Sequence, residues 1–398
     1  MSTVPFPSRL CGGLLVVMVA LLLPVHSAAG KSSYTGVLSF GDSLADTGNA
    51  LAHTGGGVGS QLPYGETFFG HPTGRASDGR IVLDFIGAHP DRHRSMADLI
   101  NIRLTYFEEL GMEYPTPYFA GKTAADFQHG VNFAYGGATA LDPEFLRSRG
   151  LTPFVLLSLA NQTAWFRQVL HLVRSVHAQR ELMARSLVMV GEMGINDYLV
   201  AFFAKRTPSE VEPLVPHVIQ AVRSLVNEVI SAGAKTVVVR GMIPLGCQPQ
   251  MLALFENTAG AEYNGKTGCL TRLNELARIH NRKLFRMVLE LRLANLGRGV
   301  DIFYADQYGP VDSIVRTPRR YGFGEKPLVA CCGGGGGKYN FGFSTFCGVE
   351  GATLCSDPSK YVSWDGIHMT DTANGRVAAA VLRSTGILRP KSLGVASA

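Results

Sequence analysis

The sequence alternates short apolar runs with longer stretches in which apolar residues recur every three or four positions. The short runs have the length and composition of buried strands, and they cover residues 37–40, 187–190, 236–239 and 301–304. The longer stretches are typical of amphipathic helices and cover residues 156–173, 211–230 and 272–293. Strands that alternate with helices predict an α/β fold, with a mostly parallel central sheet and helices on both of its faces.

The length and composition of the chain fit one folded domain. Of its 398 residues 46% are hydrophobic and 17% are charged, a balance that argues against a disordered chain. The sequence contains no internal repeat and no linker rich in proline and serine. We therefore predict a single domain over residues 30–390.

The N-terminus has the pattern of a secretory signal peptide. Arg9 precedes an apolar stretch at residues 14–23, which is followed by the small residues of "PVHSAAG". We predict a signal peptide over residues 1–29, with cleavage between Ala28 and Gly30. The apolar stretch is too short to span a bilayer comfortably, and no later segment resembles a membrane helix. We therefore expect a secreted protein, extracellular or in the cell wall, without an integral membrane segment after cleavage.

The charge of the mature chain is weakly positive. The full sequence has 37 Lys and Arg against 31 Asp and Glu. Loss of Arg9 with the signal peptide leaves 36 minus 31, a net charge of +5. No basic patch with interleaved aromatic residues is present, so the sequence gives no support to nucleic-acid binding.

Two further features fit a secreted protein. Besides Cys11 in the predicted signal peptide there are six cysteines: Cys247, Cys269, Cys331, Cys332, Cys347 and Cys355. An even number predicts disulfides, and we expect the adjacent Cys331 and Cys332 to bond to different partners. A zinc site is disfavoured because there is no CxxC pair and no histidine at ligand spacing. The only N-x-Ser/Thr sequence begins at Asn161, which is a predicted glycosylation site.

The first predicted strand is followed at once by the polar residues Asp42, Ser43 and Asp46. In open α/β sheets ligands bind beyond the carboxyl ends of the strands, so Ser43 is predicted to lie in the ligand crevice. A serine after a strand is by itself more often a turn or cap residue than a nucleophile. A phosphatase aspartate is a poor interpretation here, because Leu44 stands where the second aspartate is expected.

Polar or glycine residues mark three other places. Asn196 follows the strand at residues 187–190, and Gly136 and Gly137 form a predicted turn. Near the C-terminus, "WDGIHMT" places Asp365 three residues before His368. A carboxylate beside an imidazole fixes its tautomer and stabilises the imidazolium, and the imidazole can then take the proton of a serine hydroxyl.

Together these residues predict ester hydrolysis. Ser43 would attack the carbonyl carbon, and His368 would act first as general base and then as general acid, oriented by Asp365. The backbone N–H of Ser43, a glycine N–H and the side-chain amide of Asn196 would bind the oxyanion. Each such donor typically lowers the barrier by about 3 kcal/mol.

These segments also resemble a known family. Four blocks are similar, in the same order, to those of the GDSL esterase/lipase family, also called SGNH hydrolases: "FGDSLADTGN", "NFAYGGAT", "GINDY" and "DGIHMT". The segments "LPYGETFFGHPTGRASDGR", "IPLGC" and "CCGGGG" with "KYNF" resemble its plant-type branch. The resemblance extends from about Ser39 to the C-terminal helix.

The resemblance implies a three-layer α/β/α fold of the flavodoxin-like kind and ester hydrolysis without a metal or an organic cofactor. It assigns the nucleophile to Ser43 and the glycine oxyanion donor to Gly137, the second glycine of "YGGAT". It assigns the other donor to Asn196 and completes the site with Asp365 and His368.

The resemblance to the family also indicates an insertion in this chain. Members of the family usually run from a sequence like "DFI" almost directly into one like "EELG", whereas residues 87–107 intervene here. Our hypothesis is a retained intron or an unusual splice form. We take the run "IVLDFI", residues 81–86, as a strand that precedes the insertion.

We therefore expect a secreted serine esterase that works through an acyl-enzyme. The expected substrates carry acetyl or other small acyl groups, on cell-wall polysaccharides or on specialised metabolites. One alternative is a lipase on acyl lipids, although no long apolar lid segment stands out. The other is a catalytically silent, secreted carbohydrate-binding protein of the same fold. We expect a monomer whose partner is a small-molecule or polysaccharide ester.

Overall fold

The computed structural model describes residues 34–87, 113–334, 336–385 and 387. The predicted signal peptide over residues 1–29 lies outside the described residues, and so does the predicted insertion apart from Gly87. In the described part of the chain, no helix combines the length and the apolar character needed to cross a membrane.

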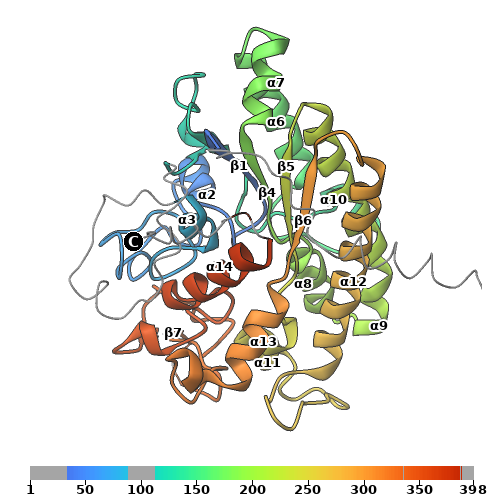
Figure 1. Ribbon diagram of the computed structural model, residues 1–398. Coiled ribbons are helices and arrows are strands. Elements are labelled where there is room, and N and C mark those ends of the chain that lie inside the picture. The colour runs from blue at the N-terminus through green and yellow to red at the C-terminus, as the bar shows by residue number, and fades with distance from the viewer. Residues whose placement is uncertain (1–33, 88–112, 335, 386, 388–398) are drawn as a thin grey trace, which may run out of the picture. The chain divides into compact units, whose positions relative to one another are not determined.

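A six-stranded sheet forms the centre of the fold, and its strands are all parallel (Figure 1). Their order is β2-β3-β1-β4-β5-β6. The strands are β1 (Gly36–Phe40), β2 (Thr116–Pro117), β3 (Gly130–Asn132), β4 (Ser186–Val190), β5 (Thr236–Arg240) and β6 (Asp301–Ala305). The four strands predicted from the sequence are confirmed to within one residue at each end, whereas β2 and β3 were not predicted.

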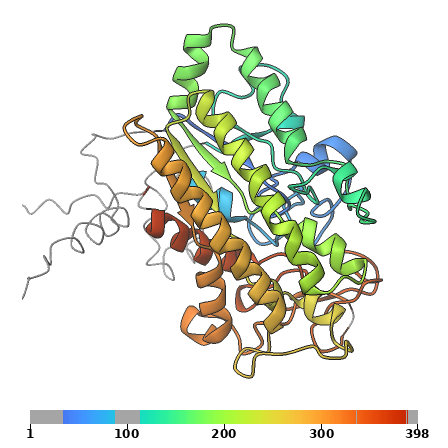
Figure 2. The same ribbon diagram turned by 90° about the vertical axis from the view of Figure 1, so that its right-hand side faces the viewer.

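Helices cover both faces of this sheet (Figures 1 and 2). On one side lie α6 (Leu159–Leu172), α10 (Val215–Ser231) and α12 (Thr271–Ala294). On the other lie α3 (Val82–Gly87) and α14 (Asp371–Thr385), which pack against each other. This arrangement confirms the predicted three-layer α/β/α fold. The second predicted helix begins later than expected because Pro213 lies in a short 3-10 turn before α10.

The remaining elements are short. The helices are α2 (Asn49–Thr54), α5 (Pro143–Arg147), α7 (Val176–Ala184), α8 (Ile195–Phe203), α9 (Pro208–Val211), α11 (Pro249–Leu254) and α13 (Tyr308–Arg316). The 3-10 turns are Tyr118–Ala120, Glu212–Leu214, Leu245–Cys247, Pro318–Tyr321 and Pro358–Lys360. Strands β7 (Cys332–Gly333) and β8 (Thr353–Leu354) form a separate antiparallel pair.

The expectation of a strand over residues 81–86 is wrong, because this run forms α3. The side chain of Asp84 accepts a hydrogen bond from the backbone N–H of Ile81 at 2.8 Å, which starts the helix. Val82, Leu83, Phe85 and Ile86 are all buried, and so is Asp84, so the helix is buried on every side. A short apolar run of this kind does not reveal its own period, and strand and helix look alike in the sequence.

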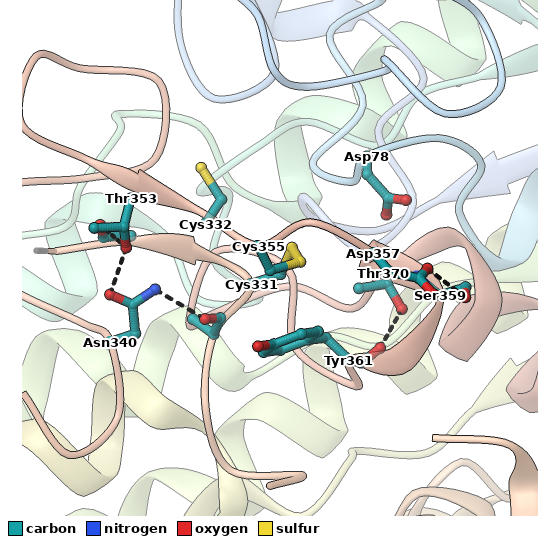
Figure 3. Close-up of a disulfide and its surroundings, with 12 residues drawn as sticks. Asp78, Cys331, Cys332, Asn340, Thr353, Cys355, Asp357, Ser359, Tyr361 and Thr370 are labelled. Atoms are coloured by element: carbon teal, nitrogen blue, oxygen red, sulfur yellow. Dashed lines mark hydrogen bonds between the residues drawn. A yellow bond between two sulfur atoms is a disulfide. The ribbon is translucent and has the colours of Figure 1, made fainter. Parts of the chain in front are cut away.

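All six cysteines of the described chain form disulfides: Cys247–Cys269, Cys331–Cys355 and Cys332–Cys347. The expectation that adjacent cysteines bond to different partners is confirmed. Two of the disulfides pack with Tyr64 and Trp364 in a small buried cluster, separate from the main core, which we call the disulfide cluster. Figure 3 shows one of them, Cys331–Cys355, beside Cys332. In the disulfide cluster, the N–H groups of Cys331 and Cys332 donate to the carbonyls of Ser363 and Trp364, at 3.0 and 2.7 Å. The disulfide cluster therefore holds the segment that leads directly into Asp365.

Candidate active site

The turn after β1 presents Ser43 and buries its neighbour. Gly41 permits this exit because a Cβ atom there would lie only 3.0 Å from Cβ of Ala45. The carboxylate of Asp42 accepts a hydrogen bond from the N–H of Leu44 at 2.9 Å, which closes the turn. As a result Asp42 is buried while Ser43 is only half-buried.

A relay of two hydrogen bonds joins Ser43 to residues near the C-terminus. Nε2 of His368 lies 2.7 Å from Oγ of Ser43, and Nδ1 of His368 lies 2.7 Å from Oδ2 of Asp365. Ser43 and His368 are 325 positions apart in the sequence. Both histidine contacts fit one tautomer, with Nδ1 donating to the carboxylate and Nε2 accepting from the hydroxyl. This arrangement can move a proton away from the serine.

The loop that carries Asp365 and His368 is shaped by the aspartate itself. Its Oδ1 accepts hydrogen bonds from the N–H groups of Ile367 and His368, at 2.9 and 2.7 Å. The residues form a bend and no helix. The two side chains face each other because the carboxylate closes this tight turn.

Tyr64 is a member of the site that the sequence did not reveal. Its hydroxyl donates to Oδ2 of Asp365 at 2.9 Å, the oxygen that also faces His368. Its ring packs edge-on against Trp364 in the disulfide cluster, with centroids 5.9 Å apart. Tyr64 lies in the segment "LPYGETFFG", which contributed to the family resemblance. However, neither its spacing nor its residue type connects it to an aspartate 301 positions away.

The charges of His368 and Asp365 stabilise each other. Burial alone would lower the pKa of His368, but the charge of Asp365, the hydrogen bond to it and the charge of Asp42 together raise it above 6.5. Burial alone would raise the pKa of Asp365, but the charge and hydrogen bonds of His368 hold it below its usual 3.8. The imidazolium is therefore stabilised, as a general base requires.

The two glycines of "YGGAT" have different roles in the backbone. The N–H of Gly136 donates to Oδ2 of Asp46 at 2.8 Å. Gly137 adopts a positive φ of 82°. Among the described residues, the N–H groups of Ser43 and Gly137 have no hydrogen-bond acceptor. Of the two glycines, Gly137 is therefore the one whose N–H remains available to a ligand.

Asn196 lies in the first turn of α8, at the carboxyl end of β4. Its side-chain amide donates to the carbonyl of Ala138 at 2.9 Å and to Oδ2 of Asp42 at 3.3 Å. The neighbouring Asp197 accepts from the N–H groups of Ala140 and Leu141, at 2.8 and 2.9 Å, and so ties the glycine loop to α8. Asn196 thus lies between the serine turn and the glycine loop, with one strong and one weaker hydrogen bond.

A buried group of charged residues lies behind the serine turn. Burial is the main reason why the pKa of Asp42 rises to about 6 and that of Arg240 falls to about 10. Arg240 donates to Oε1 of Gln307, at 2.8 Å through Nη2. Burial also raises the pKa of Glu192 well above its usual range, and neither of its carboxyl oxygens has a hydrogen-bond partner among the described residues. Burial without a hydrogen-bond partner therefore favours the neutral form of Glu192.

The predicted glycosylation site lies in the first turn of α6. Oδ1 of Asn161 accepts from the backbone N–H of Ser158 at 2.8 Å and forms part of a capping box. Glycosylation of Asn161 stays a prediction. In the described part of the chain, no group of three or more His, Cys, Asp or Glu side chains could hold a metal ion.

Comparisons with known proteins identify the family. The family model described as GDSL-like Lipase/Acylhydrolase matches residues 37–381. A GDSL esterase/lipase of Arabidopsis thaliana is 42% identical over 363 residues, which cover 90% of this chain and 86% of the relative. A sinapine esterase of Brassica napus is 37% identical over 380 residues, which cover 94% of this chain and 92% of the relative. Matches over nearly the whole length show that this chain belongs to the GDSL esterase/lipase family of carboxylic ester hydrolases.

Proposed function

We propose that this protein is a secreted serine esterase, with Ser43 as nucleophile, His368 as general base and acid, and Asp365 as the residue that orients His368. The observation that carries this proposal is the relay of two 2.7 Å hydrogen bonds from Asp365 through His368 to Ser43. The chemistry needs no group beyond these side chains and a water molecule.

In the first half of the reaction, Oγ of Ser43 attacks the carbonyl carbon while its proton moves to Nε2 of His368. The imidazolium is stabilised by Asp365 through Nδ1. The tetrahedral intermediate collapses, and Nε2 returns the proton to the oxygen of the departing alcohol. The acyl group remains bonded to Ser43.

In the second half, a water molecule takes the place of the alcohol. Nε2 of His368 accepts a proton from this water molecule while the water oxygen attacks the acyl carbon. The second tetrahedral intermediate releases the carboxylic acid, and the proton on Nε2 returns to Oγ of Ser43. Both halves use the same tautomer of His368.

The oxyanion that forms in both halves would be bound by three donors: the N–H groups of Ser43 and Gly137 and the side-chain amide of Asn196. The two N–H groups have no acceptor among the described residues. Asn196 keeps its 2.9 Å bond to Ala138 and turns its second amide hydrogen from Asp42, 3.3 Å away, to the oxyanion. The two backbone N–H groups need no such change, so they would bind the oxyanion with little reorganisation.

We further propose that the substrates are esters of acetyl or other small acyl groups, on cell-wall polysaccharides or on specialised metabolites. The relative from Brassica napus is named a sinapine esterase, which supports a specialised metabolite as the substrate. Three disulfides support secretion, because such bonds persist in oxidising compartments.

The test is hydrolysis of p-nitrophenyl acetate by the wild type and by Ser43→Ala. We expect Ser43→Ala to lower kcat by at least about a thousandfold, as for other serine hydrolases that lose the nucleophile. The matched control is Ser224→Ala, which removes an exposed hydroxyl from α10 that bonds only its own helix. Equal rates for the wild type and Ser43→Ala would reject the proposed mechanism, whereas a loss confined to Ser43→Ala supports it.

A further inference from the structure

Five phenylalanines form a continuous row of rings, which we call the phenylalanine arc: Phe154, Phe203, Phe343, Phe341 and Phe346. Successive centroids lie 5.7 Å apart from Phe154 to Phe203 and 5.6 Å apart from Phe203 to Phe343. The row continues from Phe343 to Phe341 at 5.1 Å and on to Phe346 at 6.0 Å. Every pair meets edge to face, which is a favourable geometry for aromatic rings.

The arc connects the two sides of the candidate active site. At one end, the segment of Phe154 and Val155 packs against Gly137, where a Cβ atom would lie 3.3 Å from Cγ1 of Val155. At the other end, the ring of Phe341 lies so close to Gly366 that a Cβ atom there would be 2.2 Å from Cδ2 of the ring. Gly366 lies in the loop between Asp365 and His368. The arc therefore begins at the proposed oxyanion loop and ends at the histidine loop.

A third connection between the arc and the candidate active site runs through α8. Phe203 is the last residue of α8, the helix whose first turn carries Asn196. The arc thus contacts three of the segments that supply proposed catalytic groups.

Much of the arc is exposed, although its residues are large and apolar. Phe154 is 50% exposed, Phe343 is 43% exposed and Phe346 is 45% exposed. A contiguous apolar surface of this kind beside a reactive site is typical of a binding surface.

The loop of Phe341, Phe343 and Phe346 is held in shape from both ends. The Cys332–Cys347 disulfide closes this loop. Asn340, with a positive φ of 49°, donates to the carbonyl of Ala330 at 2.9 Å and accepts from the hydroxyl of Thr353 at 2.8 Å (Figure 3). A non-glycine residue in this backbone region is held there by its surroundings. The exposed rings are therefore ordered before a ligand binds, which lowers the entropy cost of binding.

We propose that the phenylalanine arc binds an aromatic ring of the ester substrate, an inference that rests on the esterase function proposed above and narrows its substrate class to aryl esters. The centroid spacings of 5.1–6.0 Å are those at which a further ring packs edge to face or offset. Phenylalanine has no polar atom, so a sugar on this surface would lose hydrogen bonds to water without replacement. These features favour an aryl group over a polysaccharide.

The test compares three esters: methyl cinnamate, with the ring in the acyl part; benzyl acetate, with the ring in the alcohol part; and methyl butanoate, without a ring. The variants are Phe343→Ala and Phe154→Ala, whose side chains are exposed enough for the fold to survive. The matched control is Phe285→Ala, which removes a 39% exposed ring from α12 that pairs with Tyr304 outside the arc.

We expect Phe343→Ala and Phe154→Ala each to lower kcat/KM about 3- to 10-fold for one of the two ring-bearing esters, methyl cinnamate or benzyl acetate. This is the range expected for the loss of one aromatic contact. With methyl butanoate, both arc variants are expected to keep a kcat/KM close to that of the wild type. Phe285→Ala is expected to do so with all three esters. The aryl ester that is affected identifies whether the acyl or the alcohol part carries the ring.

Two outcomes would overturn this inference while the esterase function stands. One is an equal loss with all three esters, and the other is an unchanged rate with both aryl esters. Failure of the esterase function itself is distinguishable, because then the wild type and Ser43→Ala would hydrolyse every ester at the same rate.

Discussion

Tyr64 and His368 bind the same carboxylate oxygen, Oδ2 of Asp365, at 2.9 and 2.7 Å. With the two N–H groups on Oδ1, the aspartate accepts four hydrogen bonds and has no freedom to rotate. Burial and the nearby charge of Asp365 raise the pKa of Tyr64 well above 10, which favours the protonated hydroxyl that donates to Asp365. Tyr64 is therefore a positioning residue that acts through Asp365.

Tyr64→Phe removes one of these donors and keeps the ring. We expect a loss of about 1.5–3 kcal/mol in the free energy of unfolding, the range for a hydrogen bond to a charged group. The carboxylate becomes a stronger partner for the imidazolium, so the acid limb of the kcat/KM profile moves to higher pH. Denaturant unfolding and a pH–rate profile measure the two effects.

The matched control is Tyr361→Phe. Tyr361 packs against the same disulfide cluster, and its hydroxyl has no hydrogen-bond partner among the described residues (Figure 3). This variant is expected to leave the pH profile unchanged. A Tyr64→Phe enzyme whose profile coincides with that of Tyr361→Phe would show that Tyr64 has only a packing role.

The raised pKa of His368 gives the proposed mechanism a defined pH dependence. A general base must be neutral, and protonation of His368 removes it. Because Asp365 and Asp42 raise this pKa above 6.5, we expect kcat/KM to fall with decreasing pH through a midpoint above 6.5. A pH–rate profile with p-nitrophenyl acetate measures the midpoint, and a flat profile between pH 5 and 8 would point to a different base.

Asp42→Asn removes a negative charge that raises the pKa of His368. The pKa of His368 then falls, and the acid limb of activity moves to lower pH. The amide oxygen can still accept from the N–H of Leu44, so the serine turn is retained. Asp312→Asn on the outer helix α13 serves as the control, with no shift expected. An acid limb that stays in place, or moves to higher pH, in Asp42→Asn contradicts the assigned interaction.

Alanine substitutions separate the two glycines of the oxyanion loop. Gly137→Ala strains a backbone with φ of 82° and meets Val155 at 3.3 Å, so the N–H is displaced. We expect kcat to fall by about 100- to 1000-fold, as for the loss of one oxyanion donor. In Gly136→Ala the new Cβ meets no atom closer than 3.6 Å, so a much smaller loss is expected. A reversed order of the two variants would assign the donor to Gly136.

The double substitution Cys331→Ser and Cys355→Ser tests how the disulfide cluster supports the histidine loop. Loss of a bond that closes a loop of this length typically costs about 3 kcal/mol of the free energy of unfolding. Because the N–H of Cys331 donates to Ser363, two residues before Asp365, we also expect a lower kcat under conditions where the protein stays folded. Unchanged kcat with reduced stability would limit the cluster to a structural role.

The sequence predicted the parts of the fold that local patterns encode. The strand at residues 187–190 is an unbroken apolar run, that at residues 37–40 is interrupted only by Ser39, and α12 shows a clear helical period. In contrast, β3 has only three residues and includes Asn132, so it lacks an apolar signature. The run at residues 81–86 is apolar except for Asp84 and is too short to show a period, and this ambiguity produced the wrong strand.

The candidate site also contains residues that the sequence predicted and residues that only the fold reveals. Ser43 and Asn196 lie in recognisable sequence blocks at predicted strand ends, and His368 lies in the block "DGIHMT" near the C-terminus. The structure brings His368 to Ser43 and places Asn196 beside the serine turn. Tyr64 was missed because its contact to Asp365 depends on how two distant loops pack. The choice between Gly136 and Gly137 also depends on the fold, since it is the carboxylate of Asp46 that occupies one of the two N–H groups.

The 325-residue separation between Ser43 and His368 has a consequence for biosynthesis. The proposed base lies in the loop before α14, and α14 is anchored by Asp371 to Arg80 at 2.9 Å. A polypeptide shortened by a stop codon before residue 368 would therefore lack both the proposed base and this anchor, and we expect it to be catalytically silent even if its first strands fold.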